Sequence, residues 1–213
     1  MNIITVAIGA HYETVSKRLL NSLGRFVYVI DVNHSQYTQI SNDHLINALY
    51  HKCNFANLIE VEDPSIPILF CDADMFALQD NPLETFDVPS GTDVAYVPYK
   101  GKWHLPDSTR QNAFDYHGHK INSGFLWFKD LSTAQAVSSQ WAHEYLEREK
   151  IYNVEQGTSK YEYDEWALMI ALQKMSLNIH LLNSKWNKWT LSTLEEMQAS
   201  DGVFFQSHEH FNL

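Results

Sequence analysis

Cysteine is scarce in this sequence, and the two that occur, Cys53 and Cys71, form neither a disulfide framework nor a zinc-binding pattern. No apolar stretch approaches the length of about 18 residues that a membrane span requires. The N-terminus has no basic region followed by a long apolar run, so we expect no signal peptide. Repeats, linkers and low-complexity segments are also missing. These absences predict a cytoplasmic protein in which residues 1–213 form a single domain.

Positively charged residues are also scarce in this sequence. Lys and Arg number 15 against 26 Asp and Glu, which gives a formal net charge of −11. This balance argues against a nucleic acid or an anionic membrane as the main partner. A small anionic ligand would need a local cation, which a bound metal ion can supply. Apolar residues make up 45% of the 213, enough for a sizeable hydrophobic core.

One stretch, ILFCDADMFAL at residues 68–78, carries the strongest chemical signal. The run from Pro67 to Cys71 is short and apolar without alternation, which is typical of a strand buried on both faces. Asp72 and Asp74 then lie at the carboxyl end of this strand, where open α/β sheets bind ligands. In an extended chain the two carboxylates point the same way, and a divalent cation would relieve their repulsion. The pattern predicts a metal or phosphate site; alternatively, one Asp caps a turn and the other is solvated.

The rest of the chain alternates between strand and helix patterns, which predicts an α/β fold whose first three strands are parallel. Asp164 is expected to cap the helix that it opens. Residues 100–120 form an irregular segment long enough to be a functional loop. The patterns predict helices at 13–23, 41–58, 133–150 and 164–175, and strands at 3–8, 26–32, 67–71, 93–99, 121–128, 178–182 and 203–206.

Four features occur in a recognisable order. The first is the strand and turn AIGAHY, followed by a helix. The second, and the most specific, is Lys52 on a helix, a proline-marked turn and then ILFCDADMFALQDNPLETF. The third is Asn122-Ser123-Gly124 in a strand, and the fourth is Asp164-Glu165 at a helix start. Together they resemble the glycosyltransferases of the GT-A fold, and within them the retaining family of glycogenin, galactinol synthase and the bacterial lipopolysaccharide galactosyltransferases.

The resemblance implies a Rossmann-like mixed sheet flanked by helices and a hexosyltransferase that uses a D-x-D motif. The donor would be a nucleotide-diphosphate sugar, expected to be a UDP-sugar, and the acceptor a carbohydrate or glycoconjugate. Transfer would retain the anomeric configuration. The implied cofactor is Mn²⁺ or Mg²⁺, held by Asp72, Asp74 and His208, with His210 as the rival third ligand.

The resemblance also implies roles for other residues. Arg18 and Lys52 would neutralise the phosphates, although both could instead lie on a solvated helix face. Trp103, His104 and Trp186 could form a sugar-stacking surface on loops. The residues expected to hold the base and ribose are Ala7, Ile8, Gly9 and Tyr12. Those expected at the donor diphosphate and sugar are Asp72, Ala73, Asp74, Ser123 and Gly124, and those expected to be catalytic are Asn122, Asp164 and Glu165.

The sequence departs from the family pattern in two places, and two other readings stay open. After His208 the family shows a glycine and then lysine-proline-tryptophan, which this sequence lacks, and Glu165 replaces a family glutamine. One alternative is a haloacid-dehalogenase-like phosphatase, but that class favours Thr or Val at the position of Met75. The other is a catalytically silent nucleotide- or carbohydrate-binding protein of the same fold, since a fold does not fix a function.

Overall fold

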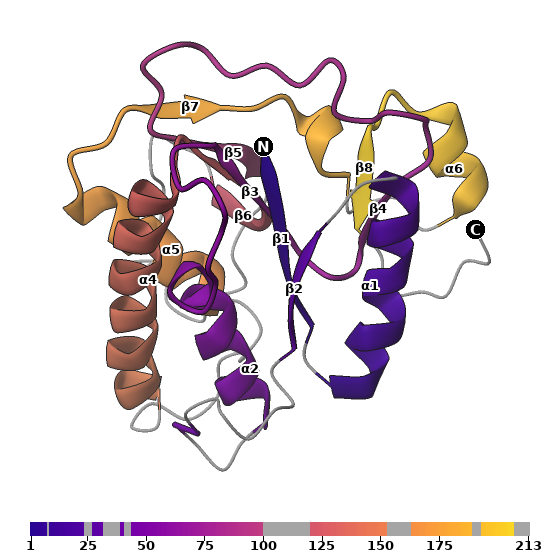
Figure 1. Ribbon diagram of the computed structural model, residues 1–213. Helices are drawn as coiled ribbons and strands as arrows, with labels where there is room; N and C mark the ends of the chain where they lie inside the picture. Colours follow the sequence, from indigo (N-terminus) through magenta and orange to yellow (C-terminus); the bar gives the residue numbers. More distant parts are fainter. Residues whose placement is uncertain are drawn as a thin grey trace.

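The computed structural model describes residues 1–7, 9–23, 27–31, 39–40, 44–99, 120–152, 163–188 and 193–206. These residues form a six-stranded sheet, a second sheet of two strands, and helices on both sides (Figure 1). The predicted α/β class is confirmed. The order across the six-stranded sheet is β2 (Tyr28–Asp31), β1 (Asn2–Ala7), β3 (Ile68–Cys71), β6 (Lys120–Phe128), β5 (Val94–Tyr99) and β7 (Ile179–Leu181).

The six-stranded sheet is mixed. Strand β1 pairs in parallel with β2 and β3, as the strand–helix–strand pattern predicts. Strand β6 is antiparallel to both of its neighbours, β3 and β5, and β5 pairs in parallel with β7. This arrangement places the carboxyl end of β3 beside the middle of β6, because Cys71 is opposite Phe125.

Strand β3 is buried on both faces, as its continuous apolar run predicts. Ile68 and Phe70 belong to one hydrophobic core, while Leu69 and Cys71 belong to another, and all four are fully buried. The first core is covered by α2 (His44–Cys53), α4 (Leu131–Tyr152) and α5 (Tyr163–Lys174). The second is covered by α1 (Gly9–Leu23) and by the second sheet, which lie on the opposite side of Figure 1.

The second sheet consists of β4 (Met75–Ala77) and β8 (Phe204–Gln206), with Met75 opposite Gln206. Strand β8 is at the place predicted for the last strand, whereas β4 was not predicted. The short helix α6 (Leu194–Ala199) precedes β8 and starts with a capping box formed by Thr193 and Glu196. The second sheet thus brings the end of the described chain next to the two aspartates.

Three local predictions are wrong. The chain is not extended through Asp72 and Asp74, because residues 73 and 74 form a turn in which the Met75 N–H donates to the Asp72 carbonyl at 3.1 Å. This turn transfers the chain from β3 to β4. The helix predicted at 41–58 ends at Cys53 and is followed by a 3₁₀ turn, η1 (Phe55–Asn57). Helix α5 begins at Tyr163, so Asp164 lies within its first turn and is not the N-cap.

Across the described ranges, none of the helices combines the length and the apolar character that a membrane crossing would need.

Candidate functional site

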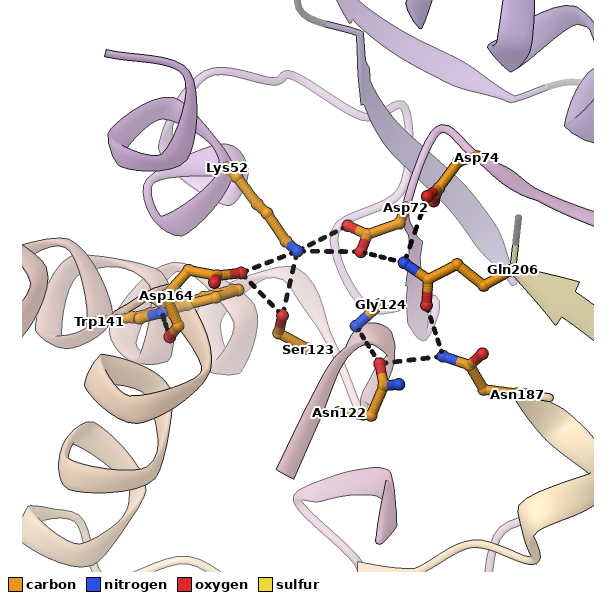
Figure 2. A network of polar contacts seen from close by, with 10 residues as sticks. All are labelled: Lys52, Asp72, Asp74, Asn122, Ser123, Gly124, Trp141, Asp164, Asn187 and Gln206. Atoms are coloured by element: carbon orange, nitrogen blue, oxygen red, sulfur yellow. Dashed lines mark hydrogen bonds and ion pairs between the residues drawn. The ribbon is translucent and has the colours of Figure 1, made fainter. Parts of the chain in front are cut away.

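Lys52 lies at the centre of a buried polar network (Figure 2). Its Nζ lies 2.8 Å from Asp72 Oδ1 and 2.8 Å from Asp164 Oδ2. It also donates to Ser123 Oγ at 3.0 Å, and that hydroxyl in turn donates to Asp164 Oδ2 at 2.8 Å. Since these residues come from α2, the end of β3, β6 and α5, one ammonium group joins four separate segments.

The charges in this network are unequal, with two carboxylates facing one ammonium group. Burial acts to lower the pKa of Lys52, but the charges and hydrogen bonds of Asp164 and Asp72 raise it well above its usual value, so the amine stays protonated. Burial raises the pKa of Asp72 to about 6, against the attraction of Lys52 and with the help of the Asp74 charge. The cluster therefore favours an additional positive charge near Asp72 and Asp74.

The side chain of Gln206 joins the two aspartates of the D-x-D motif. Its Nε2 donates to Asp72 Oδ2 at 3.2 Å and to Asp74 Oδ2 at 3.4 Å (Figure 2). One oxygen of each carboxylate therefore lies within 3.4 Å of a single atom, even though the backbone between them forms a turn. The carboxylates converge as the sequence predicts, but for a different geometric reason.

A chain of amides continues from Gln206 to strand β6. The Nδ2 of Asn187 lies 3.4 Å from Gln206 Oε1 and donates to Asn122 Oδ1 at 2.9 Å. Asn122 Oδ1 also accepts the Gly124 backbone N–H at 2.7 Å. Asn187 reaches this position because Lys188 hydrogen-bonds with β8 through its backbone. Asn122 is therefore linked to the aspartates through two side-chain amides.

Gly124 is closely surrounded by this network. A Cβ at this position would lie 2.9 Å from Asp72 Oδ2 and 3.0 Å from both Asn122 Oδ1 and Gln206 Oε1. Its carbonyl accepts the Asp72 N–H at 2.8 Å, which fixes Asp72 against β6. A side chain here would displace the polar groups that position Asp72, so the glycine is explained by the close approach of its neighbours.

The N-terminal residues predicted to bind the donor are only partly placed by the structure. Ala7 is buried at the end of β1, and Gly9 begins α1. Arg18 lies over the Phe76 ring at 5.1 Å; burial lowers its pKa, and the nearby Asp74 charge opposes that shift. The α1 residues therefore border the aspartates from the other side. Tyr12 is half-buried on α1, and Ile8 lies outside the described residues.

The donor set around the aspartates fits a hard divalent cation. Asp72 and Asp74 supply carboxylate oxygens of the kind that Mn²⁺ and Mg²⁺ prefer. Within the described ranges, no third His, Cys, Asp or Glu joins them in a group that could hold a metal ion. The predicted third ligand, His208, and its rival His210 lie outside these ranges, two and four residues beyond the end of β8. Their roles stay predictions.

Glu165 follows Asp164 in the first turn of α5 and is half-buried. Burial raises the pKa of its carboxyl to about 8, and the Asp164 charge adds to this shift. Lys52 and a hydrogen bond from the Ser123 backbone act in the opposite direction. At neutral pH the carboxyl therefore keeps its proton, and it then resembles the neutral glutamine of the family pattern in size and charge.

Glu165→Gln is expected to change the dependence of stability on pH. Because the folded protein holds this proton up to a pH of about 8, whereas the ordinary value is 4.5, its stability falls with rising pH in that interval. The slope from this group is at most about 1.4 kcal/mol per pH unit. Urea unfolding at pH 5, 6.5 and 8 should show the variant gaining stability relative to the wild type at each step. Glu195→Gln, an exposed control in α6, should show a constant difference, and the same constancy in Glu165→Gln would contradict the assignment.

The structure brings most of the predicted site residues together and corrects one of them. Trp186, expected on a sugar-stacking surface, is buried and packs against the Phe86 ring at 4.8 Å and the Phe125 ring at 6.3 Å. Trp103 and His104 lie outside the described residues. The group that converges on the network comprises Lys52, Asp72, Ala73, Asp74, Asn122, Ser123, Gly124, Asp164 and Glu165.

Two residues of the site, Asn187 and Gln206, were missed from the sequence. Gln206 follows the apolar run Val203–Phe205 just as Asp72 follows its own apolar run, and this common pattern was the available signal. Asn187 carries no such signal, because it lies in a short aromatic segment after η3 (Ser184–Trp186).

No protein-family profile matches the chain, and no curated protein sequence matches it. Solved structures do match. The galactosyltransferase LgtC in complex with donor and acceptor sugar analogs aligns with a TM-score of 0.58 and 14% identity, over 97% of this chain and 86% of that one. Mouse xyloside xylosyltransferase 1 aligns with a TM-score of 0.55 and 12% identity, over 97% of both chains. A glycosyltransferase involved in glycosylation of the major capsid of PBCV-1 aligns with a TM-score of 0.57 and 11% identity, over 96% of this chain and 91% of that one. The chain has the GT-A fold of these glycosyltransferases.

Proposed function

We propose that this protein is a metal-dependent glycosyltransferase that transfers a hexose from a UDP-sugar to a carbohydrate or glycoconjugate acceptor, with retention of configuration. The observation that carries the proposal is the convergence of Asp72 and Asp74 on one point at the end of β3, in a protein with the GT-A fold. The fold gives no support to the phosphatase alternative.

The two aspartates would hold a Mn²⁺ or Mg²⁺ ion. Such an ion, when bound, supplies positive charge to the departing diphosphate and so stabilises the leaving group. Arg18, which borders Asp74 from α1, would add positive charge on the nucleotide side of the site. The turn after β1, with Ala7 and Gly9, would receive the base and ribose.

The donor sugar would lie against strand β6, where Asn122, Ser123 and Gly124 meet the carboxylates. The lack of a side chain at Gly124 lets the Asp72 and Asn122 side chains approach the strand closely at this point, and we assign the Asn122 amide to the sugar hydroxyls. Lys52 holds the Asp164 carboxylate at 2.8 Å, so that Asp164 and the adjacent Glu165 are fixed in one position. We assign these two carboxyl groups to the reacting face of the sugar and to the acceptor.

A nucleotide panel tests the proposal. Thermal unfolding would be followed with Mn²⁺ and UDP, GDP, ADP or CMP, each at about 100 times its Kd. A ligand at that concentration stabilises the folded state by about 2.7 kcal/mol. For a chain of this size, that corresponds to a rise in Tm of roughly 5 to 11 °C. We expect the largest shift with UDP, and only when Mn²⁺ is present; a larger shift with GDP or ADP would contradict the UDP assignment.

Product analysis separates the enzyme from its alternatives. With Mn²⁺ and a UDP-hexose but no acceptor, a glycosyltransferase should slowly release UDP. A phosphatase should instead release inorganic phosphate from simple phosphate esters. A silent binding protein should show the thermal shift with neither product, and that result would overturn the proposed activity while keeping the proposed ligand.

A further inference from the structure

Helix α4 makes a buried polar contact with the first turn of α5. The indole Nε1 of Trp141 donates to the backbone carbonyl of Asp164 at 2.6 Å (Figure 2). Trp141 is fully buried in the first core, so its N–H needs an acceptor within the protein. The Asp164 carbonyl, by contrast, belongs to a helix, where a carbonyl already faces the N–H four residues further on. The contact therefore satisfies the indole and also fixes the start of α5 relative to α4.

A second buried contact connects the same face of α4 to α2. Ser138 is fully buried and precedes Trp141 by three residues, which places the two side chains next to each other on the helix. Its Oγ donates to the Cys53 carbonyl at 2.7 Å and accepts the Ala56 N–H at 3.2 Å. Cys53 is the last residue of α2 and directly follows Lys52. Ser138 therefore fixes the backbone beside Lys52, as Trp141 fixes the backbone of Asp164.

The two residues fixed in this way are partners in one ion pair. Lys52 Nζ lies 2.8 Å from Asp164 Oδ2, and the two side chains are only 11% and 4% exposed. Because Lys52 and Asp164 come from different helices, their separation depends on how α2 and α5 are held relative to each other. Helix α4 packs beside both of them (Figure 1). Its two polar contacts therefore determine where the ammonium group and the carboxylate meet.

We propose that Ser138 and Trp141 are positioning residues that set the separation of Lys52 and Asp164, and so place Asp164 and Glu165 against the donor sugar. Both are fully buried, so neither touches a substrate, and both act through the backbone of other residues. The inference rests on the proposed glycosyltransferase function. It adds to that function two residues of α4, a helix that carries none of the four sequence features resembling the family.

Trp141→Phe tests the proposal because it keeps an aromatic ring in the core and removes the N–H donor. Release of UDP would be followed with Mn²⁺ and no acceptor, well below the Tm of each variant. The probe is UDP-glucose or UDP-galactose, whichever the wild type hydrolyses faster. A shift of about 1 Å at a reacting group can cost about 100-fold in rate, so we expect kcat to fall about 10- to 100-fold. The KM should not change, because the groups assigned to the metal and the nucleotide keep their contacts. Ser138→Ala should lower kcat in the same way.

Two control variants separate positioning from a general loss of stability. Lys174→Met removes another contact between α4 and α5, since Lys174 Nζ lies 2.6 Å from Glu144 Oε1 at the far end of α5. Trp127→Phe makes the same change of side chain at a partly buried position that packs against the second core. Both controls should lower the Tm and leave kcat unchanged.

The contrary outcomes keep this inference separate from the function on which it rests. If the wild type releases UDP and Trp141→Phe loses no more kcat than the two controls, Trp141 is only a core residue, and the inference is wrong while the proposed function stands. A raised KM with an unchanged kcat would contradict the inference in the same way, because the effect would then lie in donor binding. If the wild type releases no UDP, the proposed function and the inference are both overturned.

Discussion

Lys52→Met is expected to lower the free energy of unfolding by about 3 to 5 kcal/mol at neutral pH. The substitution removes the ammonium group that contacts Asp72 and Asp164 at 2.8 Å each, and leaves the buried Asp164 carboxylate and the half-buried Asp72 carboxylate without the charge that they share. The expected loss corresponds to a fall in Tm of roughly 6 to 20 °C for a chain of this size. Chemical and thermal unfolding of the variant without metal or nucleotide would measure it.

Lys129→Met is the matched control. Lys129 contacts Asp93 at 2.6 Å, which is shorter than either contact of Lys52, but its side chain is 47% exposed whereas that of Lys52 is 11% exposed. Exposed ion pairs contribute about 0 to 1 kcal/mol, so the control should lose much less stability. Equal losses of stability in the two variants would show that burial of the ion pair does not determine how strongly Lys52 stabilises the protein.

The loss in Lys52→Met should also depend on pH. Burial already raises the pKa of Asp72 to about 6 against the attraction of Lys52, so in the variant this carboxyl takes up a proton as the pH falls through that range, which removes part of the uncompensated charge and with it part of the destabilisation. Combining Lys52→Met with Asp164→Asn removes one of the two charges by substitution and should recover part of the lost stability at neutral pH. A penalty that is constant with pH and unaffected by the second substitution would assign the loss to packing alone.

Much of the fold could be predicted because it depends on local patterns. The apolar run before Asp72 predicts a strand buried on both faces, and Ile68 and Leu69 do point into different cores. The turn at residues 73 and 74 could not be predicted from that run. It exists because β4 pairs with β8, and these strands lie far apart in the sequence.

The polar network at the site could not be predicted from local sequence patterns either. The resemblance singles out Lys52, Asp72, Ser123 and Asp164, but no local pattern shows that one ammonium group joins them. Lys52 and Ser123 are 71 residues apart, and Gln206 is 134 residues from Asp72. Trp186 was misassigned for a related reason: an aromatic residue in a short loop looks exposed until Phe86 and Phe125, distant in sequence, are seen to enclose it.

Asp74→Asn should remove metal-dependent function with little effect on the fold. Asparagine keeps the size and an oxygen that can accept from Gln206, so the contact that is now 3.4 Å can persist. The substitution relieves the repulsion with Asp72 but removes the charge that faces Arg18, and these opposing changes should keep stability within about 1 kcal/mol of the wild type.

The loss should therefore appear in binding and turnover. A metal ion contributes several kcal/mol to the stabilisation of a departing phosphate, which corresponds to at least about a 10³-fold loss of UDP-hexose turnover in Asp74→Asn. Calorimetric titration with Mn²⁺ should show affinity reduced by about 100-fold or more. Asp80→Asn, at an exposed position shortly after Asp74 in the sequence, should retain both the Mn²⁺ affinity and the turnover of the wild type. Mn²⁺-dependent turnover that survives in Asp74→Asn would mean that the aspartates at the end of β3 are not the metal site, since no other charged ligand next to Asp72 could replace the lost carboxylate within the described part of the chain.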